Sequence, residues 1–373
     1  MASENFTMVS GFILQGFSAH PEMQDAIFGV LLVIYVITLV GNLGMILLIS
    51  IDPGLHTPMY FFLCQLSCVD ICHSSNIIPK ALENSLWGSK YISVAECFMQ
   101  MYIFTVCSSS ECFFLSLMAY DRYIAICNPL LYTVVMSSKQ CLKLATALHV
   151  TAFIYSILHA AWIRSLSFCH SNVIDHFFCE IPSLLKLSCS NTHRYEVVLL
   201  FTAILHIVGS NLIIMGSYAY ILSTILRLQS AEGRKKAFST CASHLTAVIA
   251  FYGTGACTYL QSRTENSQEQ DKMVSMFYTV VTPMLNPLIY SLRNKEVKDA
   301  LRRERDREEW AYGARLLYLK ERNIALLERM VDTQERQVSG GLGNGAMEEE
   351  HQVFDSILAL AASFMLVAAQ PPA

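Results

Sequence analysis

The stretch AIFGVLLVIYVITLVGNLGMILLIS, residues 26–50, limits the fold more than any other feature of this chain. It has no charged side chain and is longer than the ~20 residues that a helix needs to cross the hydrocarbon core. Only 15% of the 373 residues are charged and 53% are hydrophobic, whereas soluble domains average about 25% charged residues. The stretch also begins too late, and lacks the basic leader, for a cleaved signal peptide. We therefore expect a membrane protein whose first span is an uncleaved anchor.

Six further segments have a suitable length, namely residues 57–79, 97–126, 143–163, 197–226, 237–260 and 273–292. An odd number of spans places the two ends of the chain on opposite sides of the membrane. Lys and Arg are more numerous on the cytoplasmic side if the N-terminus lies outside, as the positive-inside rule requires. The sequon at Asn5 agrees with this orientation, because glycosylation of Asn5 needs a lumenal N-terminus.

The cysteines follow the predicted topology. Nine of the thirteen lie in or near spans, where Cys behaves as a small apolar residue. The other four fall on the predicted outer side, and they are Cys97, Cys169, Cys179 and Cys189. An even number in an oxidising compartment predicts two disulfides, with three connectivities open. Three of the four lie in the loop between the fourth and fifth spans, so we expect that loop to form a tied-down lid.

Several short motifs together resemble the odorant receptor branch of the rhodopsin-like G-protein-coupled receptors. They are LHTPMY (55–60), MAYDRYIAIC (118–127), HFFCE (176–180), SY (217–218), KAFSTCASHL (236–245) and PMLNPLIYSLRN (283–294). The resemblance covers roughly residues 1–302. It implies an all-α bundle of seven transmembrane helices in the plasma membrane, with the N-terminus outside and a short amphipathic helix after the seventh span. It also implies disulfides Cys97–Cys179 and Cys169–Cys189.

The adjacent charges of Asp121 and Arg122 have two interpretations. A pair at a helix end can simply reach the aqueous edge of the membrane. In the resembled family, Asp121 would hold Arg122 at rest and release it to meet a G protein. The switch residues that the resemblance implies are Asp121, Arg122, Tyr123, Asn286, Pro287 and Tyr290.

Two acids lie inside predicted spans, where a lone carboxylate is costly. The resemblance turns Asp70 and Glu111 toward the bundle interior, near Asn42 and Asn286. Because two nearby carboxylates do not both ionise cheaply, we expect a proton or a cation between them. The resemblance implies a sodium site, and the alternative is a hydrogen-bonded polar cluster with a structural role.

The predicted ligand site is a mixture of apolar walls, hydroxyls and imidazoles, which suits a small and mostly uncharged organic molecule. On the third span, helical spacing places one set on the inward face: Phe104, Thr105, Ser108, Ser109 and Cys112. The resemblance adds His159, Thr202, His206, Tyr252, Gly255, Ala256, Tyr259, Met276 and Thr279. Phe104 stands where amine receptors have an acid, and residues 273–292 contain no Lys for a retinal Schiff base.

The cytoplasmic side begins with a basic cluster of Arg234, Lys235 and Lys236. After the seventh span, Val297, Ala300 and Leu301 share one side of the expected amphipathic helix. We divide the chain into an extracellular N-terminus (1–25), the receptor domain (26–302) and an atypical tail (303–373). The tail has helix-like periodicity at Leu316, Leu319, Leu326, Leu327 and Met330, followed by a flexible acidic linker. We expect ligand responses not to require it.

Three classes of function compete. A receptor would bind an odorant outside and activate a stimulatory G protein that raises cyclic AMP, without chemistry on the ligand. A transporter or channel also uses intramembrane acids, but we find no internal repeat of the kind that transporters carry. A hydrolase would need converging catalytic or metal-binding groups, and the histidines lie on different spans without HExxH-type spacing. We therefore expect a receptor that is not an enzyme and has no cofactor apart from the sodium ion. A net charge of −4 gives no sign of a nucleic-acid partner.

Overall fold

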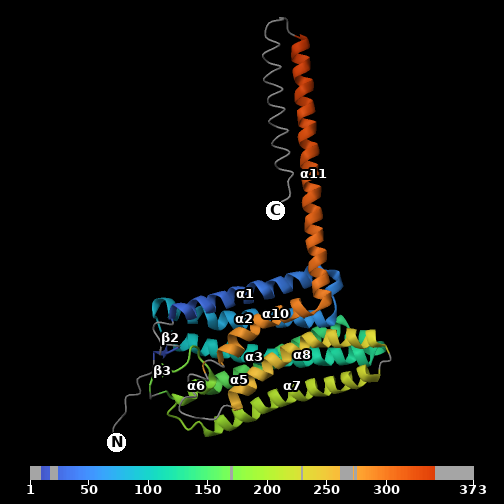
Figure 1. Ribbon diagram of the computed structural model, residues 1–373. Coiled ribbons are helices and arrows are strands. Elements are labelled where there is room, and N and C mark those ends of the chain that lie inside the picture. The colour runs from blue at the N-terminus through green and yellow to red at the C-terminus, as the bar shows by residue number, and fades with distance from the viewer. Residues whose placement is uncertain are drawn as a thin grey trace. The chain divides into compact units, whose positions relative to one another are not determined.

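The computed structural model describes residues 10–16, 24–168, 171–227, 230–260, 272 and 275–340. Five of its helices are long and apolar enough to cross a membrane, judged by length and composition. They are α1 (Gln24–Ile51), α2 (Pro58–Trp87), α3 (Val94–Cys127), α5 (Ser138–Arg164) and α7 (His193–Arg227). α8 (Ala231–Leu260) and the pair η3 (Phe277–Val281) and α10 (Thr282–Arg293) are the sixth and seventh spans. The seven-helix bundle that we predicted is confirmed, and Figure 1 shows its helices side by side.

Local sequence signals set the ends of the spans. α2 begins with a proline in its first turn and ends at Gly88, whose φ of 64° is a left-handed conformation that favours glycine. α3 begins with a capping box, in which the Ser93 side chain and the Glu96 side chain each bind the other's backbone amide. These signals stop α2 and start α3 within a few residues, which gives the tight outer connection between them.

The core of the bundle surrounds α3, which packs against α2, α5, α7 and α8. The outward faces of α1 and α7 instead expose large apolar side chains, among them Val33, Val40, Leu47, Leu212 and Met215. Exposed apolar surface of this extent on a helix of spanning length is what a lipid-facing helix presents. The protein is therefore a multi-pass membrane protein, and the burial pattern separates the lipid face from the interior.

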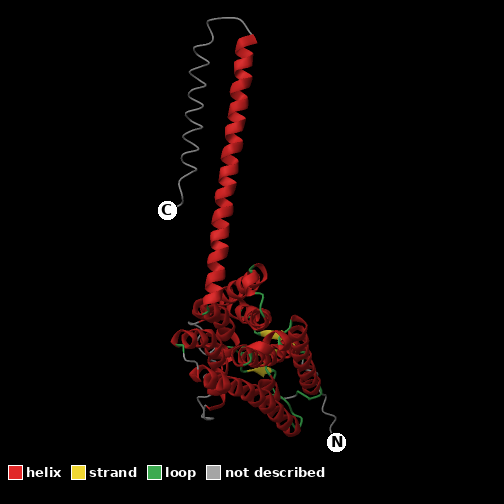
Figure 2. Cartoon of the chain, turned by 90° about the vertical axis from the view of Figure 1, so that its right-hand side faces the viewer, coloured by secondary structure: helices red, strands yellow, loops and turns green. Residues whose placement is uncertain are grey.

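A small sheet at one end of the bundle was not predicted. It contains β1 (Gly11–Leu14), β2 (Tyr91–Ser93) and β3 (Val173–Ile174), in the order β2-β1-β3. β1 is antiparallel to β2 and parallel to β3. The strands lie among the helix ends, as the yellow segments of Figure 2 show. Part of the N-terminal segment is thus built into the outer lid.

The cytoplasmic connections contain short helices: η2 (Pro53–Leu55) and α4 (Pro129–Val135). On the outer side, α6 (Ile181–Lys186) lies in the lid loop. The helix after the seventh span, α11 (Lys295–Gly340), begins where expected but continues unbroken far beyond the short helix that we predicted. Val297 and Ala300 are buried as expected, whereas Leu301 is 47% exposed.

The chain divides into two compact units, Met1–Glu304 and Arg305–Ala373. Within the first unit, Arg303 contacts Asp52 through its Nε at 2.9 Å and its Nη2 at 2.8 Å. The hydroxyl of Tyr60 donates to Glu296 at 2.6 Å. These two contacts join the start of α11 to the turn between α1 and α2 and to α2 itself.

Candidate functional site

The lid is fastened to α3 by a disulfide between Cys97 and Cys179. Gln100 reinforces this attachment, because its Oε1 accepts from the backbone amide of Cys179 at 2.9 Å. Gln100 also exchanges hydrogen bonds with Asn76 of α2, each side-chain amide donating to the other's carbonyl. Cys189 is also disulfide-bonded, whereas Cys169, its predicted partner, lies outside the described residues.

A series of aromatic rings in the lid connects it to the bundle through ring contacts. The imidazole of His176 stacks on Phe177, with ring centres 4.7 Å apart. The next ring, Phe178, is fully buried and lies 5.0 Å from Phe104 of α3. Burial lowers the pKa of His176, and the carboxylate of Glu180, 4.0 Å away, opposes this shift. The lid therefore contributes a ring to the predicted ligand region.

The first group of predicted ligand residues lies between α2, α3 and η3. Phe104 is at its centre, with ring centres 5.4 Å from His73 and 6.2 Å from Tyr278. Thr279 is fully buried, and its hydroxyl donates to the carbonyl of Ser275. Met276 packs beside this group against Ile77 and Phe178. Apolar walls therefore dominate here, and the Thr279 hydroxyl is already used within its own helix.

The second group lies between α5 and α7. Thr202 is 3.3 Å from Nε2 of His159, and the hydroxyl of Tyr195 is 3.0 Å from Nδ1 of the same ring. His159 is thus occupied on both nitrogens and acts as a structural link between the helices. The ring of His206 lies 4.2 Å from Tyr155, and His206 is half-buried. This arrangement leaves His206 better placed than His159 to meet a ligand.

The remaining predicted ligand residues differ in how far they are buried and in whether their side chains are described. Ser109 and Cys112 are buried, and the hydroxyl of Tyr252 lies close to Cys112 and Ser210. Thr105 is half-buried and donates to the carbonyl of Met101, and Ser108 is half-buried. The side chains of three predicted residues lie outside the described part of α8: Gly255, Ala256 and Tyr259.

The two intramembrane acids have separate partners. Both oxygens of the buried Asp70 carboxylate accept from the amide of Asn286, at 3.2 and 2.9 Å. Glu111 instead pairs with His73, its Oε1 lying 2.6 Å from the ring Nδ1. Asn42 binds the backbone of α10 through the carbonyl of Pro283, at 3.0 Å, rather than either acid. The polar centre of the bundle is therefore a set of hydrogen-bonded pairs that joins α1, α2, α3 and α10.

In this structure Asp121 has a partner other than Arg122. Oδ1 of Asp121 accepts from the hydroxyl of Tyr132 at 3.1 Å. Within the described residues, the other oxygen of Asp121 and Nε of Arg122 have no hydrogen-bond partner. α4 brings Tyr132 onto Asp121, and its hydroxyl occupies one of the two carboxylate oxygens. Tyr123 instead lies against Tyr220 of α7, with ring centres 5.6 Å apart.

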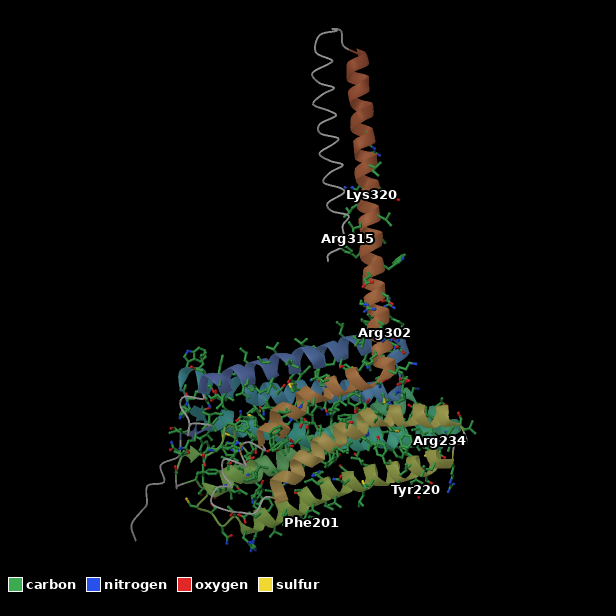
Figure 3. The ribbon with its side chains drawn as sticks, viewed as in Figure 1. Phe201, Tyr220, Arg234, Arg302, Arg315 and Lys320 are labelled. Atoms are coloured by element: carbon green, nitrogen blue, oxygen red, sulfur yellow. A yellow bond between two sulfur atoms is a disulfide. The ribbon has the colours of Figure 1, made fainter. Side chains whose placement is uncertain are left out.

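One histidine joins three helices above Arg122. Nε2 of His244 on α8 lies 3.0 Å from the carbonyl of Leu115 on α3, which has no proton to give. His244 must therefore donate there, and its Nδ1 accepts from the hydroxyl of Tyr218 on α7 at 2.7 Å. Figure 3 shows Tyr220 on α7 and Arg234 on α8 toward this end of the bundle, away from Phe201.

The seventh span approaches α1 very closely at Pro287. A side chain added at Gly41 would place its Cβ 2.9 Å from the proline ring. Tyr290, one turn further along α10, is fully buried, and its hydroxyl has no partner among the described residues. The predicted switch residues Asn286, Pro287 and Tyr290 therefore lie on the inner face of α10.

Several contact residues were missed by the sequence analysis. Phe178 and Tyr132 belong to segments outside the spans, which have no periodicity that fixes where a ring points. His73 and His244 carried a usable signal, because an imidazole inside a span needs a partner. That argument predicts that such partners exist but does not identify them.

Seven helices with a disulfide-tied outer lid, buried polar pairs and an arginine at the inner end of α3 define a seven-transmembrane receptor. Comparison with known proteins identifies the family. The olfactory receptor family model matches residues 31–305. The chain belongs to the olfactory receptor family, whose members are receptors and not enzymes.

Individual relatives agree over nearly their whole length. Olfactory receptor 5F1 of Homo sapiens is 52% identical over 301 residues, which is 81% of this chain and 96% of that relative. Olfactory receptor 5M5 of Mus musculus is 50% identical over 300 residues, covering 80% of this chain and 94% of the relative. The recognition that we made from motifs is confirmed, as is the location in the plasma membrane. The alternative of a transporter or channel has no support.

Proposed function

We propose that this protein binds small, mostly uncharged organic odorants in the outer half of the bundle and activates a stimulatory G protein that raises cyclic AMP. The observation that carries the proposal is the position of His244. It binds α3 at Leu115, one turn below the predicted ligand residue Cys112 and two turns above Arg122. A ligand that shifts α3 against α8 would therefore act on a contact that lies between the predicted ligand residues and Arg122 along α3.

The chemistry of the predicted site supports an uncharged ligand. Phe104, Phe178 and Tyr278 provide aromatic walls, and His206 and Tyr252 provide half-buried polar groups. The predicted set contains no acid or Lys to pair with an ionic ligand. A charged ligand would lose its hydration without gaining a counter-ion, and this disfavours its binding.

Activation is a shift between two arrangements of the bundle. A ligand changes their populations only as far as it binds one of them better than the other. We propose that Asp121, Arg122, Tyr123, Asn286, Pro287 and Tyr290 rearrange together in this shift. Nε of Arg122 and the hydroxyl of Tyr290 support this role, since among the described residues neither has the hydrogen-bond partner that a buried polar group normally has.

We also propose a sodium ion at Asp70 and Glu111. Oε2 of Glu111 is a buried carboxylate oxygen with no hydrogen-bond partner among the described residues, and Oγ of the adjacent Ser110 is another such oxygen. Oxygen donors of this kind suit a hard cation such as sodium. A bound cation would offset the repulsion between the two acids and favour one arrangement of the bundle. Glycosylation at Asn5 and the Cys169–Cys189 bond complete the proposal, although Asn5 and Cys169 lie outside the described residues.

The test is cyclic AMP in cells that express the chain, screened against a panel of uncharged volatile compounds. Phe104→Ala should weaken the response to an active compound by about tenfold or more, because it removes most of a buried ring from the site. Phe153→Ala is the matched control, since Phe153 is 46% exposed on the outside of α5. Surface expression is measured for each variant. Equal effects of the two substitutions, or responses to charged compounds alone, would overturn the proposed site.

A further inference from the structure

The tail beyond the receptor domain contains an internal repeat of seven residues. Three consecutive segments begin with Arg and end with Glu: RLLYLKE (315–321), RNIALLE (322–328) and RMVDTQE (329–335). All three lie within the single helix α11. A straight α-helix drifts by about 20° per seven residues against such a repeat, so a repeat kept over several turns favours a left-handed supercoil with a partner helix.

The repeat places apolar residues where a coiled coil needs them. Taking Arg as position g, positions a and d carry mostly apolar residues: Tyr312, Leu316, Leu319, Leu326 and Met330. Where α11 is described in side-chain detail, these positions are open, with Tyr312 67% and Leu319 44% exposed. Leu317 and Ile324 widen the apolar stripe on one side and are 62% and 41% exposed.

The polar residue in the middle of this seam identifies the partner, whereas the other polar residue, Thr333, lies at position d of the last repeat. Asn323 falls at position a in the middle repeat. A single Asn at an a position is satisfied best by the same Asn of an identical helix in the same register, and it specifies a parallel two-stranded coil. A foreign helix or a lipid surface would leave that amide facing apolar groups.

Charge and topology agree with a parallel pair. The apolar stripe has Arg315, Arg322 and Arg329 along one edge and Glu321 and Glu328 along the other. In a parallel pair position g of one helix faces position e of the other, so Arg322 lies toward Leu327 and Arg329 toward Gln334, and only Arg315 meets a like charge, Lys320. An antiparallel pair would instead bring the arginine edges of both helices together, which disfavours it. Two copies in one membrane start their tails from the same side and are therefore parallel. Figure 3 marks Arg315 and Lys320 along α11, and Lys320 interrupts the stripe at position e.

We propose that residues 310–336 of α11 form a parallel, in-register coiled coil with a second copy of this chain, which makes the receptor a dimer through its cytoplasmic tail. The partner is this chain itself, and the interaction does not depend on the ligand or on the G protein.

The test is cysteine cross-linking of the full-length protein in membranes, using a short bis-maleimide reagent. Asn323→Cys and Leu316→Cys place thiols in the seam, and Glu321→Cys places one at position f on the polar side. Several-fold more covalent dimer from both seam variants than from Glu321→Cys, with wild-type background subtracted, supports the proposal. Equal yields at the three positions would overturn it, because they would indicate random collision or a helix lying on the lipid surface.

A second variant tests whether the thiol at position 316 cross-links because it lies in the seam or only because it is accessible to the reagent. Asn323→Asp in the Leu316→Cys background places two like charges opposite each other and should abolish the seam dimer, whereas Glu321→Asp in the same background should leave it intact. Ending the chain after residue 340 should also preserve cross-linking. Loss of the dimer on that truncation would overturn the proposal and assign the seam to residues 341–373.

Discussion

Tyr218 of α7 donates a hydrogen bond of 2.7 Å to His244 of α8, and the same imidazole donates to the backbone of α3. Tyr218→Phe removes the hydroxyl and leaves a buried ring nitrogen without a partner. An unsatisfied buried acceptor costs about 1–3 kcal/mol. We therefore expect a lower thermal unfolding temperature for the purified variant.

Tyr220→Phe is the control, since Tyr220 lies two residues away and is 65% exposed. Its unfolding temperature should match that of the wild type. Equal losses in the two variants would show that the Tyr218–His244 bond makes no special contribution to stability.

The close approach of α1 to α10 gives a second prediction. Gly41→Val should destabilise the bundle, because its Cβ would lie 2.9 Å from the ring of Pro287. Overpacking of this kind costs about 1–3 kcal/mol. Gly44→Val adds the same side chain on the same helix where no atom lies within 4 Å. Thermal unfolding and surface expression should fall for the first variant and not for the second, and a reversed order would contradict the packing described here.

The buried pair of His73 and Glu111 gives a third prediction. Glu111→Leu should cost about 1–3 kcal/mol, because it leaves the buried Nδ1 of His73, which lay 2.6 Å from the carboxylate, without a hydrogen-bond partner. The double variant His73→Phe with Glu111→Leu replaces both polar groups by apolar ones and should recover most of the loss. A double variant that is as unstable as the sum of the single variants would show that the two residues act independently.

The limits of the sequence analysis can be explained physically. The spans were predictable because each needs a long apolar stretch, and α2, α3 and α8 were the less certain ones by hydropathy because they carry Ser, Thr, His or an acid. Strands of two to four residues such as β3 and β1 have too few positions to show alternation. The hydrogen bond from Tyr132 to Asp121 depends on how a loop helix packs, and no local pattern predicts that. The continuation of α11 to Gly340 had a signal in the heptads, which were recognised only as helix-like.

The outer lid should be sensitive to acid. Burial lowers the pKa of His176. In the unfolded chain this imidazole becomes protonated below the usual histidine pKa of about 6.5, whereas in the folded lid it stays neutral to a lower pH. Stability is therefore greatest above that pH and is lost as the pH falls below it. The charged groups around the ring act in both directions, with Glu180 and Asp175 favouring protonation and Lys272 and Lys186 opposing it.

Hydrogen exchange of peptides that cover residues 171–180 measures this effect at pH 7.5 and pH 5.5, after correction for the intrinsic exchange rate. The wild type should lose protection at the lower pH. His176→Phe keeps an aromatic ring and removes the titration, so its protection should not change with pH. Equal acid sensitivity in both proteins would assign the effect to another group.

The central claim is that an odorant bound outside drives nucleotide exchange inside. The most direct measurement is guanine-nucleotide exchange on a purified stimulatory G protein by the receptor in lipid nanodiscs, with and without an active compound. We predict faster exchange with the compound, and loss of that increase in Arg122→Ala although the compound still binds. Exchange that is unchanged by a compound shown to bind, or that is accelerated equally in Arg122→Ala, would contradict the account.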